Sequence, residues 1–69
     1  MKISSRNMLK ARVKEVVQGA VNAEVVLELP GGATVTAMIT KASVERLGLV
    51  RGQEAYAVIK ASDVMVAVD

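Results

Sequence analysis

A strict alternation of apolar and charged side chains near the N-terminus constrains the fold more than any other feature of this chain. The alternation runs through Leu9, Lys10, Ala11, Arg12, Val13 and Lys14. A period of two places the apolar side chains on one face of a β-strand and the cations on the other. Residues 7–17 are therefore predicted to form a long strand in a sheet with one covered face.

Glycine-containing turns separate further runs of strand-like sequence. Pro30-Gly31-Gly32 is a strong turn signal, and the β-rich segments on either side of it, residues 22–29 and 33–39, are expected to pair as a hairpin. Residues 54–60 are predicted to form a fourth strand. Residues 64–68 are apolar at every position, so we expect a fifth strand that is buried on both faces.

The period changes to that of a helix in residues 40–49. Thr40 is a suitable N-cap, because its side-chain oxygen can accept a hydrogen bond from a free N–H of the first turn. Gly48 suits the left-handed residue that ends many helices. Five strands with one short helix between the third and the fourth is the element order of an OB-like barrel. We predict this all-β fold for a single domain spanning residues 1–69, with an SH3-like small barrel as the alternative.

The hydrophobic content is high for so small a domain. Of the 69 residues, 52% are hydrophobic, and Tyr56 is the only aromatic one. A domain of this size buries only about 60% of the surface of its unfolded chain. One sheet face cannot hide this many aliphatic side chains, so we expect an oligomer whose subunits cover one another's apolar surface.

The residue types that are missing exclude several kinds of site. The chain contains no Cys and no His, which removes disulfides, thiolate zinc sites and the common nucleophile–base pairs. We expect no catalytic residue, no direct protein ligand to a metal and no enzymatic activity. The N-terminus lacks the apolar run of a signal peptide, and no uncharged stretch reaches the length of a membrane span. The expected location is the cytoplasm, with no membrane partner.

Two small polar clusters near the ends of the chain supply the main candidates for ligand binding. The first contains Ser4, Arg6 and Asn7, with Ser5 as the alternative hydroxyl to Ser4, and the second contains Lys60 and Ser62. Hydroxyls, an amide and two cations can all donate hydrogen bonds, which suits an oxyanion. Taken singly, each cluster is also compatible with ordinary polar residues at the end of a strand.

Two internal segments offer further donors. Small residues beside Val21 and Asn22 would let an anion approach the backbone N–H groups closely, although a plain hairpin turn is the simpler local explanation. Thr40 and Ser43, at the expected helix N-terminus, are candidates for a second oxyanion site. A capped helix without a ligand is the simpler explanation there.

Taken together, these segments resemble the Mop family, the small molybdate-binding proteins also called molbindins. The same domain occurs in molybdate-responsive regulators and in a transporter ATPase subunit. The likeness covers nearly the whole chain and lies in four ordered segments: Ser4-Ser5-Arg6-Asn7; Gly19-Ala20-Val21-Asn22-Ala23-Glu24-Val25; Ile39-Thr40 with Ser43 and Leu47-Gly48-Leu49; and Ala57-Val58-Ile59-Lys60-Ala61-Ser62-Asp63-Val64. The family pattern often has Ala where this chain has Ser5, a change that is not expected to disturb the site.

The resemblance implies a hexamer of OB-like barrels, a trimer of dimers, that holds molybdate or tungstate between subunits for molybdenum storage and homeostasis. It implies that Ser4 and Arg6 of one chain meet Lys60 and Ser62 of a neighbour. The two cations would balance the dianion, while hydroxyls and the backbone N–H groups of the internal turn would hold its oxygens.

Two other classes of function stay open on the sequence alone. A nucleic-acid-binding OB module would use Lys10, Arg12 and Lys14, but one aromatic residue cannot form the platform on which single-stranded bases usually stack. We therefore expect no nucleic-acid partner. A scaffold that only oligomerises would be unaffected by replacing Arg6 or Lys60 with alanine. The net charge of +2 permits an anionic ligand without demanding one.

Overall fold

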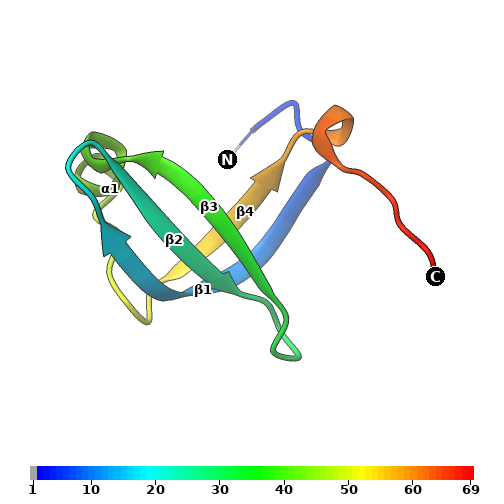
Figure 1. The fold of residues 1–69 in the computed structure, drawn as a ribbon, viewed down its shortest axis with the longest axis horizontal. Coiled ribbons are helices and arrows are strands. Elements are labelled where there is room, and N and C mark those ends of the chain that lie inside the picture. The colour runs from blue at the N-terminus through cyan, green and yellow to red at the C-terminus, as the bar shows by residue number, and fades with distance from the viewer. Residues whose placement is uncertain (1) are drawn as a thin grey trace.

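The protein folds into a strongly curved antiparallel sheet with one short helix at one end (Figure 1). The structure is a computed structural model that describes residues 2–69. Its elements are β1 (Asn7–Gln18), β2 (Asn22–Glu28), β3 (Thr34–Thr40), α1 (Lys41–Leu47), β4 (Glu54–Ile59) and one turn of 3₁₀ helix, η1 (Ala61–Asp63). The strand order is β3-β2-β1-β4. The first four predicted strands and the predicted helix are confirmed.

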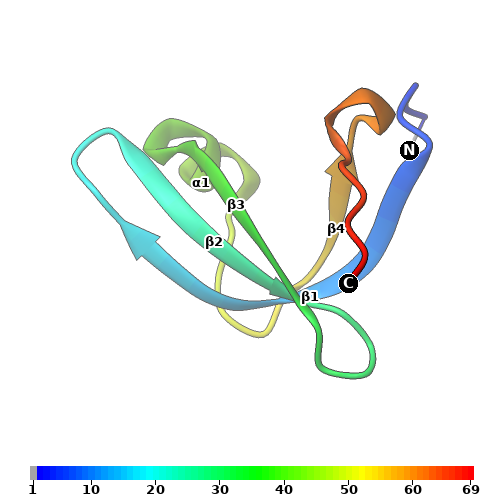
Figure 2. The same ribbon diagram turned by 45° about the vertical axis from the view of Figure 1, so that its right-hand side comes forward.

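β1 is long enough to pair with two different strands along its length. Its C-terminal part pairs with β2 and its N-terminal part pairs with β4, and Arg12 belongs to both registers. The register with β2 shifts between Val13 and Glu15, and such a bulge bends a strand and increases its twist. Figure 2 shows the result, a half-barrel in which β2 and β3 lie on one side of the bend in β1 and β4 lies on the other.

The core lies along the inner face of the curved sheet. It consists of alanine and branched aliphatic side chains: Ala11, Val13, Ala23, Val25, Leu27, Val44 and Ala57. Two apolar positions of the predicted alternation, Ala11 and Val13, are buried, while the third, Leu9, is 39% exposed and the alternating cations are exposed. The period-two pattern therefore identified the buried face of β1 at Ala11 and Val13. Val44 is the one buried residue of α1, so the helix covers the core at the end where β1 turns into β2.

Both ends of α1 are capped as the sequence predicts. The Thr40 side chain accepts a hydrogen bond from the N–H of Ser43 at 3.0 Å, which satisfies one of the free donors of the first turn. Gly48 has φ 62°, and its N–H donates to carbonyls of the last turn. A side chain at this left-handed position would be strained, so glycine stabilises the exit from the helix.

The predicted fifth strand at residues 64–68 is not formed within one chain. Residues 64–69, the C-terminal tail, follow η1 without strand pairing. Met65, Val66 and Val68 are 92%, 90% and 91% exposed. A strand needs a second backbone to satisfy its N–H and C=O groups, and the apolar sequence predicts burial without identifying that partner. One chain therefore forms a four-stranded half-barrel instead of a closed five-stranded barrel.

Candidate functional site

Antiparallel pairing of β1 with β4 brings the two polar clusters from the ends of the chain to the same end of the sheet. Asn7, the first residue of β1, pairs in register with Ile59, the last residue of β4. Figures 1 and 2 show the N-terminal segment beside η1, which directly follows β4. We call the predicted residues that gather here the paired-end cluster: Ser4, Arg6, Asn7, Lys60 and Ser62.

This arrangement places within one chain two segments that the resemblance assigns to different chains. The resemblance implied that the segment with Ser4 and Arg6 would meet the segment with Lys60 and Ser62 across a subunit boundary. The β1–β4 register makes these segments neighbours within one chain, because an antiparallel pair places the start of one strand beside the end of the other. The sequence predicts both strands, but it contains no signal that shows which residues of β1 pair with which residues of β4.

The cations of the paired-end cluster carry no internal counter-ion. Arg6, Lys60, Ser4 and Ser62 are all exposed, whereas Asn7 is half-buried. Within residues 2–69, neither the Arg6 guanidinium nor the Lys60 ammonium lies in an ion pair. Two free cations beside free hydroxyl groups have the composition of a binding site for a dianion.

A second set of predicted residues lies at the opposite end of the sheet, and we call it the hairpin-end cluster: Val21, Asn22, Thr40 and Ser43. Asn22 pairs in register with Thr40, and the carbonyl of Val21 accepts a hydrogen bond from the N–H of Lys41 at 2.8 Å. These contacts attach the β1–β2 turn to the start of α1. Val21 is 71% exposed, so the turn is open to a neighbouring molecule.

The hydroxyl groups of the hairpin-end cluster already bind each other. Thr40 Oγ1 donates to Ser43 Oγ at 2.8 Å and accepts from the Ser43 N–H at 3.0 Å. The Thr40 hydroxyl is therefore engaged in the helix cap. The hydroxyl hydrogen of Ser43 is left as the donor that a second oxyanion would use.

The two clusters are too far apart to share a ligand within one chain. The 12 residues of β1 separate them, and an extended strand rises about 3.3 Å per residue. Even with the bend in β1, Figure 2 shows the N-terminal segment and the β1–β2 turn at the tips of opposite arms. A small anion that contacts both clusters must take them from different chains.

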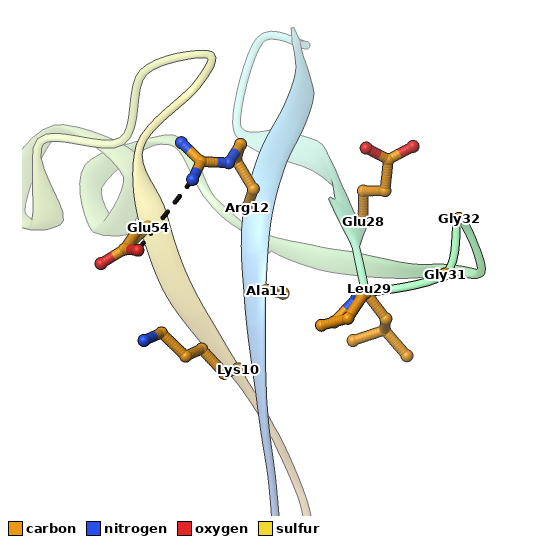
Figure 3. A pocket seen from close by; sticks show the side chains of 9 residues that line it. Lys10, Ala11, Arg12, Glu28, Leu29, Gly31, Gly32 and Glu54 are labelled. Atoms are coloured by element: carbon orange, nitrogen blue, oxygen red, sulfur yellow. Dashed lines mark ion pairs between the residues drawn. The ribbon is translucent and has the colours of Figure 1, made fainter.

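Two hollows in the surface lie away from both clusters, and the one of about 610 Å³ lies between β1 and the segment after α1. A cavity of about 520 Å³ lies between β1 and the β2–β3 turn (Figure 3). Arg12 Nη2 lies 4.0 Å from Glu54 Oε1, and Arg12 Nη1 donates to the carbonyl of Gly52 at 2.7 Å. Two cations, Lys10 and Arg12, and two carboxylates, Glu28 and Glu54, line this hollow, and such a balance of charge does not favour a dianion.

The same pairing weakens the case for nucleic-acid binding. Lys14 Nζ also lies 4.0 Å from a carboxylate, Glu28 Oε2. Two of the three alternating cations of β1 thus face acids of the neighbouring strands. Among residues 2–69 there is also no group of three or more carboxylates that could hold a metal ion. No helix in this part of the chain is long and apolar enough to cross a membrane.

Sequence reasoning considered Ser5 at the paired ends only as an alternative to Ser4 and missed its hydrogen bonds to the backbone. Its hydroxyl donates to the carbonyl of Ile59 at 2.7 Å and accepts from the N–H of Asn7 at 3.3 Å. The available signal was a serine two residues before the first residue of a strand, a spacing at which hydroxyls bind the backbone locally. No feature of the sequence predicts the cross-strand bond to Ile59, because that bond depends on the β1–β4 register.

The sequence pattern of the TOBE domain family matches residues 3–66. This stretch includes every residue of both clusters. The chain belongs to the TOBE domain family. The four strands, the helix and the two polar ends described above are therefore features of one TOBE domain.

Named relatives and solved structures agree with this assignment. Molybdenum-pterin-binding protein 3 of Clostridium pasteurianum is 53% identical over 66 residues, which are 96% of this chain and 97% of the relative. The structure of a molybdate-binding protein from Sporomusa ovata matches with a TM-score of 0.92 at 44% identity, over 99% of this chain and 100% of that one. The cytoplasmic molybdate-binding protein ModG, with molybdate bound, matches with a TM-score of 0.90 at 52% identity, over 94% of this TOBE domain and 46% of ModG. The resemblance to the Mop family is confirmed.

Proposed function

We propose that this TOBE domain binds molybdate and tungstate in the cytoplasm and serves molybdenum storage and homeostasis. One observation carries the proposal: Arg6 and Lys60, two exposed cations without a carboxylate partner among residues 2–69, flank the same end of the β1–β4 pair. The names of the molybdate-binding relatives, one of them described as cytoplasmic, support the choice of ligand and location. The function is binding of the anion, with no catalytic step.

Each side chain of the paired-end cluster has a role that follows from its chemistry. Arg6 and Lys60 balance the two negative charges of the anion, and the fork of the guanidinium can bind two oxygens at once. The hydroxyls of Ser4 and Ser62 and the amide of Asn7 donate to the remaining oxygens. A tetrahedral dianion needs donors on all sides, and one chain presents this cluster at an open sheet end.

A second chain completes the site in this proposal. The backbone N–H groups near Val21 and Asn22 lie at the far end of the sheet, so those that contact the anion come from a neighbour. Thr40 and Ser43 line a separate secondary site through the hydroxyl hydrogen that the helix cap leaves available. The resulting assembly is a homohexamer, a trimer of dimers.

The exposed C-terminal tail supports the proposed assembly. β3 and β4 are the two outer strands of the sheet, so each has an edge without a partner strand. The tail is apolar and nine-tenths exposed at Met65, Val66 and Val68. When the tail of a second copy lies along these edges, it becomes the fifth strand, its side chains are buried and the barrel closes.

Selectivity follows from the size and protonation of the anion. Molybdate and tungstate are tetrahedral dianions of nearly one size, so a ring of donors hardly distinguishes them. Sulfate is smaller, and a rigid ring set for the larger ion leaves long, weak hydrogen bonds to it. Phosphate is partly protonated near neutral pH, and a site made only of donors leaves that proton without an acceptor.

Isothermal titration calorimetry with molybdate, using sulfate as the competitor, tests the proposed function. We expect tight molybdate binding that excess sulfate does not displace. Light scattering on the same sample gives the mass of the assembly. Absence of heat with both molybdate and tungstate would overturn the proposed ligand, whereas binding by a monomer would overturn only the shared site.

A further inference from the structure

The hydroxyl of Ser5 links the two chain segments at the paired ends. It donates to the Ile59 carbonyl at 2.7 Å and accepts from the Asn7 N–H at 3.3 Å. Two hydrogen bonds in series therefore connect Asn7 of β1 to Ile59 of β4. Asn7 and Ile59 are also the last register pair of the β1–β4 ladder, so the hydroxyl sits where the regular backbone pairing ends.

The bond to the Asn7 N–H fixes the backbone on either side of Arg6. It closes a short turn from Ser5 to Asn7, with Arg6 as the enclosed residue. Ser5 and Asn7 are half-buried, whereas Arg6 between them is exposed. The turn thus holds the arginine outward at the sheet end, where its guanidinium faces solvent and has no carboxylate partner within residues 2–69.

The bond to the Ile59 carbonyl fixes the backbone directly before Lys60. Lys60 is the N-terminal flanking residue of η1 and makes no side-chain capping bond of its own. Among the described residues, the Ser5 bond is the only hydrogen bond that joins residues 2–6 to β4 or to the segment after it. One hydroxyl therefore restrains the main chain next to both free cations.

We propose that Ser5 is a positioning residue for the oxyanion site of this chain, which restrains the backbone beside Arg6 and Lys60 and so favours the larger tetrahedral anions. This inference rests on the proposed function and adds to it a residue that contacts the backbone and not the anion. A methyl group at this position can neither donate to Ile59 nor accept from Asn7. The two cations would then adjust independently around a bound ion.

The loss of the hydroxyl has a consequence beyond weaker binding. A rigid pair of cations favours the anion whose size fits their spacing, whereas a loosened pair can close on a smaller one. Removing the Ser5 hydroxyl should therefore weaken molybdate binding more than sulfate binding. A side chain that only stabilised the fold would lower the melting temperature and leave the ratio of the two affinities unchanged.

Titration calorimetry of the full chain with molybdate and, separately, with sulfate tests this role in the wild type, Ser5→Ala and Ser5→Thr. Thr36→Ala is the matched control, because Thr36 is exposed on β3, distant from the paired ends, and its hydroxyl makes no hydrogen bond within the described residues. For Ser5→Ala we expect about a three- to tenfold rise in the Kd for molybdate, as for the loss of one neutral hydrogen bond. The Kd for sulfate should change less, and Ser5→Thr, which keeps the hydroxyl, should restore the molybdate affinity.

The outcomes separate this inference from the proposed function. If the wild type binds molybdate and Ser5→Ala binds it equally well, the positioning role is wrong and the proposed function stands. Equal weakening of molybdate and sulfate, or failure of Ser5→Thr to restore binding, would also overturn the positioning role. If the wild type itself binds neither molybdate nor tungstate, both proposals fail.

Discussion

The cations in the middle of β1 and those at its open end differ in what faces them. Arg12 and Lys14 each lie 4.0 Å from a carboxylate oxygen. Arg6 and Lys60, at the paired ends, have no such partner within the part of the chain that the structure describes. Position in the sheet contributes to the difference: Glu54 and Glu28 both lie opposite Arg12 in the registers, whereas Arg6 and Lys60 lie beyond the last β1–β4 pair.

This comparison shows how one charge type can serve two purposes in a chain of 69 residues. Exposed ion pairs contribute little to stability, typically less than about 1 kcal/mol, because water and salt screen them. Their effect here is to pair two of the three alternating cations of β1 with acids. In the proposed function, the unpaired cations at the paired ends attract the anion.

Replacing the free cations should have the largest effect. For Arg6→Ala and for Lys60→Ala we expect a loss of molybdate affinity of about tenfold to a hundredfold, because each change removes a charge-assisted hydrogen bond. Calorimetry measures the affinity. The melting temperature without ligand should stay near that of the wild type, since both side chains are exposed. Wild-type affinity in either variant would show that these cations do not form the site.

A charge in the C-terminal tail should weaken assembly of the chains and thereby weaken molybdate binding at the paired ends. Val66→Asp places a carboxylate in the segment that we propose to be buried against a second copy, and burial of an unpaired charge is strongly unfavourable. We expect light scattering to show smaller species and calorimetry to show weaker molybdate binding. Val50→Asp is the control, because Val50 is also exposed but lies outside the tail. An intact assembly in Val66→Asp would contradict the docked tail.

Removing the helix cap should lower the stability of the fold without weakening molybdate binding at the paired ends. Thr40→Ala removes the acceptor of the Ser43 N–H bond, and loss of such a cap costs about 1 kcal/mol. Thermal or denaturant unfolding measures this cost. Molybdate binding should remain within about twofold of the wild type, since the substitution leaves in place both the side chains of the paired-end cluster and the backbone N–H groups near Val21 and Asn22. A large loss of affinity would mean that Thr40 contributes to the main site.

The smallest effect is expected for the paired cation of β1. Arg12→Ala should change the free energy of unfolding by less than about 1 kcal/mol, as for most exposed ion pairs. Molybdate affinity should not change measurably, in contrast to Arg6→Ala. Urea unfolding and calorimetry on the same preparation check both statements. A loss of affinity comparable to that of Arg6→Ala would remove the distinction between the two groups of cations.

Local patterns in the sequence were sufficient for most of the half-barrel. The alternation from Leu9 to Lys14 identified the buried face of β1, and Pro30-Gly31-Gly32 located the β2–β3 turn. Thr40 and Gly48 marked the ends of the helix. Each of these signals acts over a few residues, so it can be read without knowledge of the tertiary structure.

The parts that the sequence could not predict all depend on contacts between distant segments. The apolar tail suggested a fifth strand, but no local signal shows which edge would pair with it. The β1–β4 register, which joins Asn7 to Ile59, decided that the two polar clusters meet within one chain. The bond from Ser5 to Ile59 could not be predicted from the sequence, because it exists only in that register.

The position of Ser62 in η1 has a consequence for how anion binding and assembly of the chains influence each other. The same three residues, Ala61–Asp63, carry a donor of the proposed site and set the direction in which the tail leaves the sheet. A tail that is fixed by a neighbour therefore also fixes the Ser62 backbone. By thermodynamic linkage, an anion that binds better to the fixed arrangement tightens the contact between chains by the same factor. In such a protein, the supply of anion would help to determine the amount of assembled store.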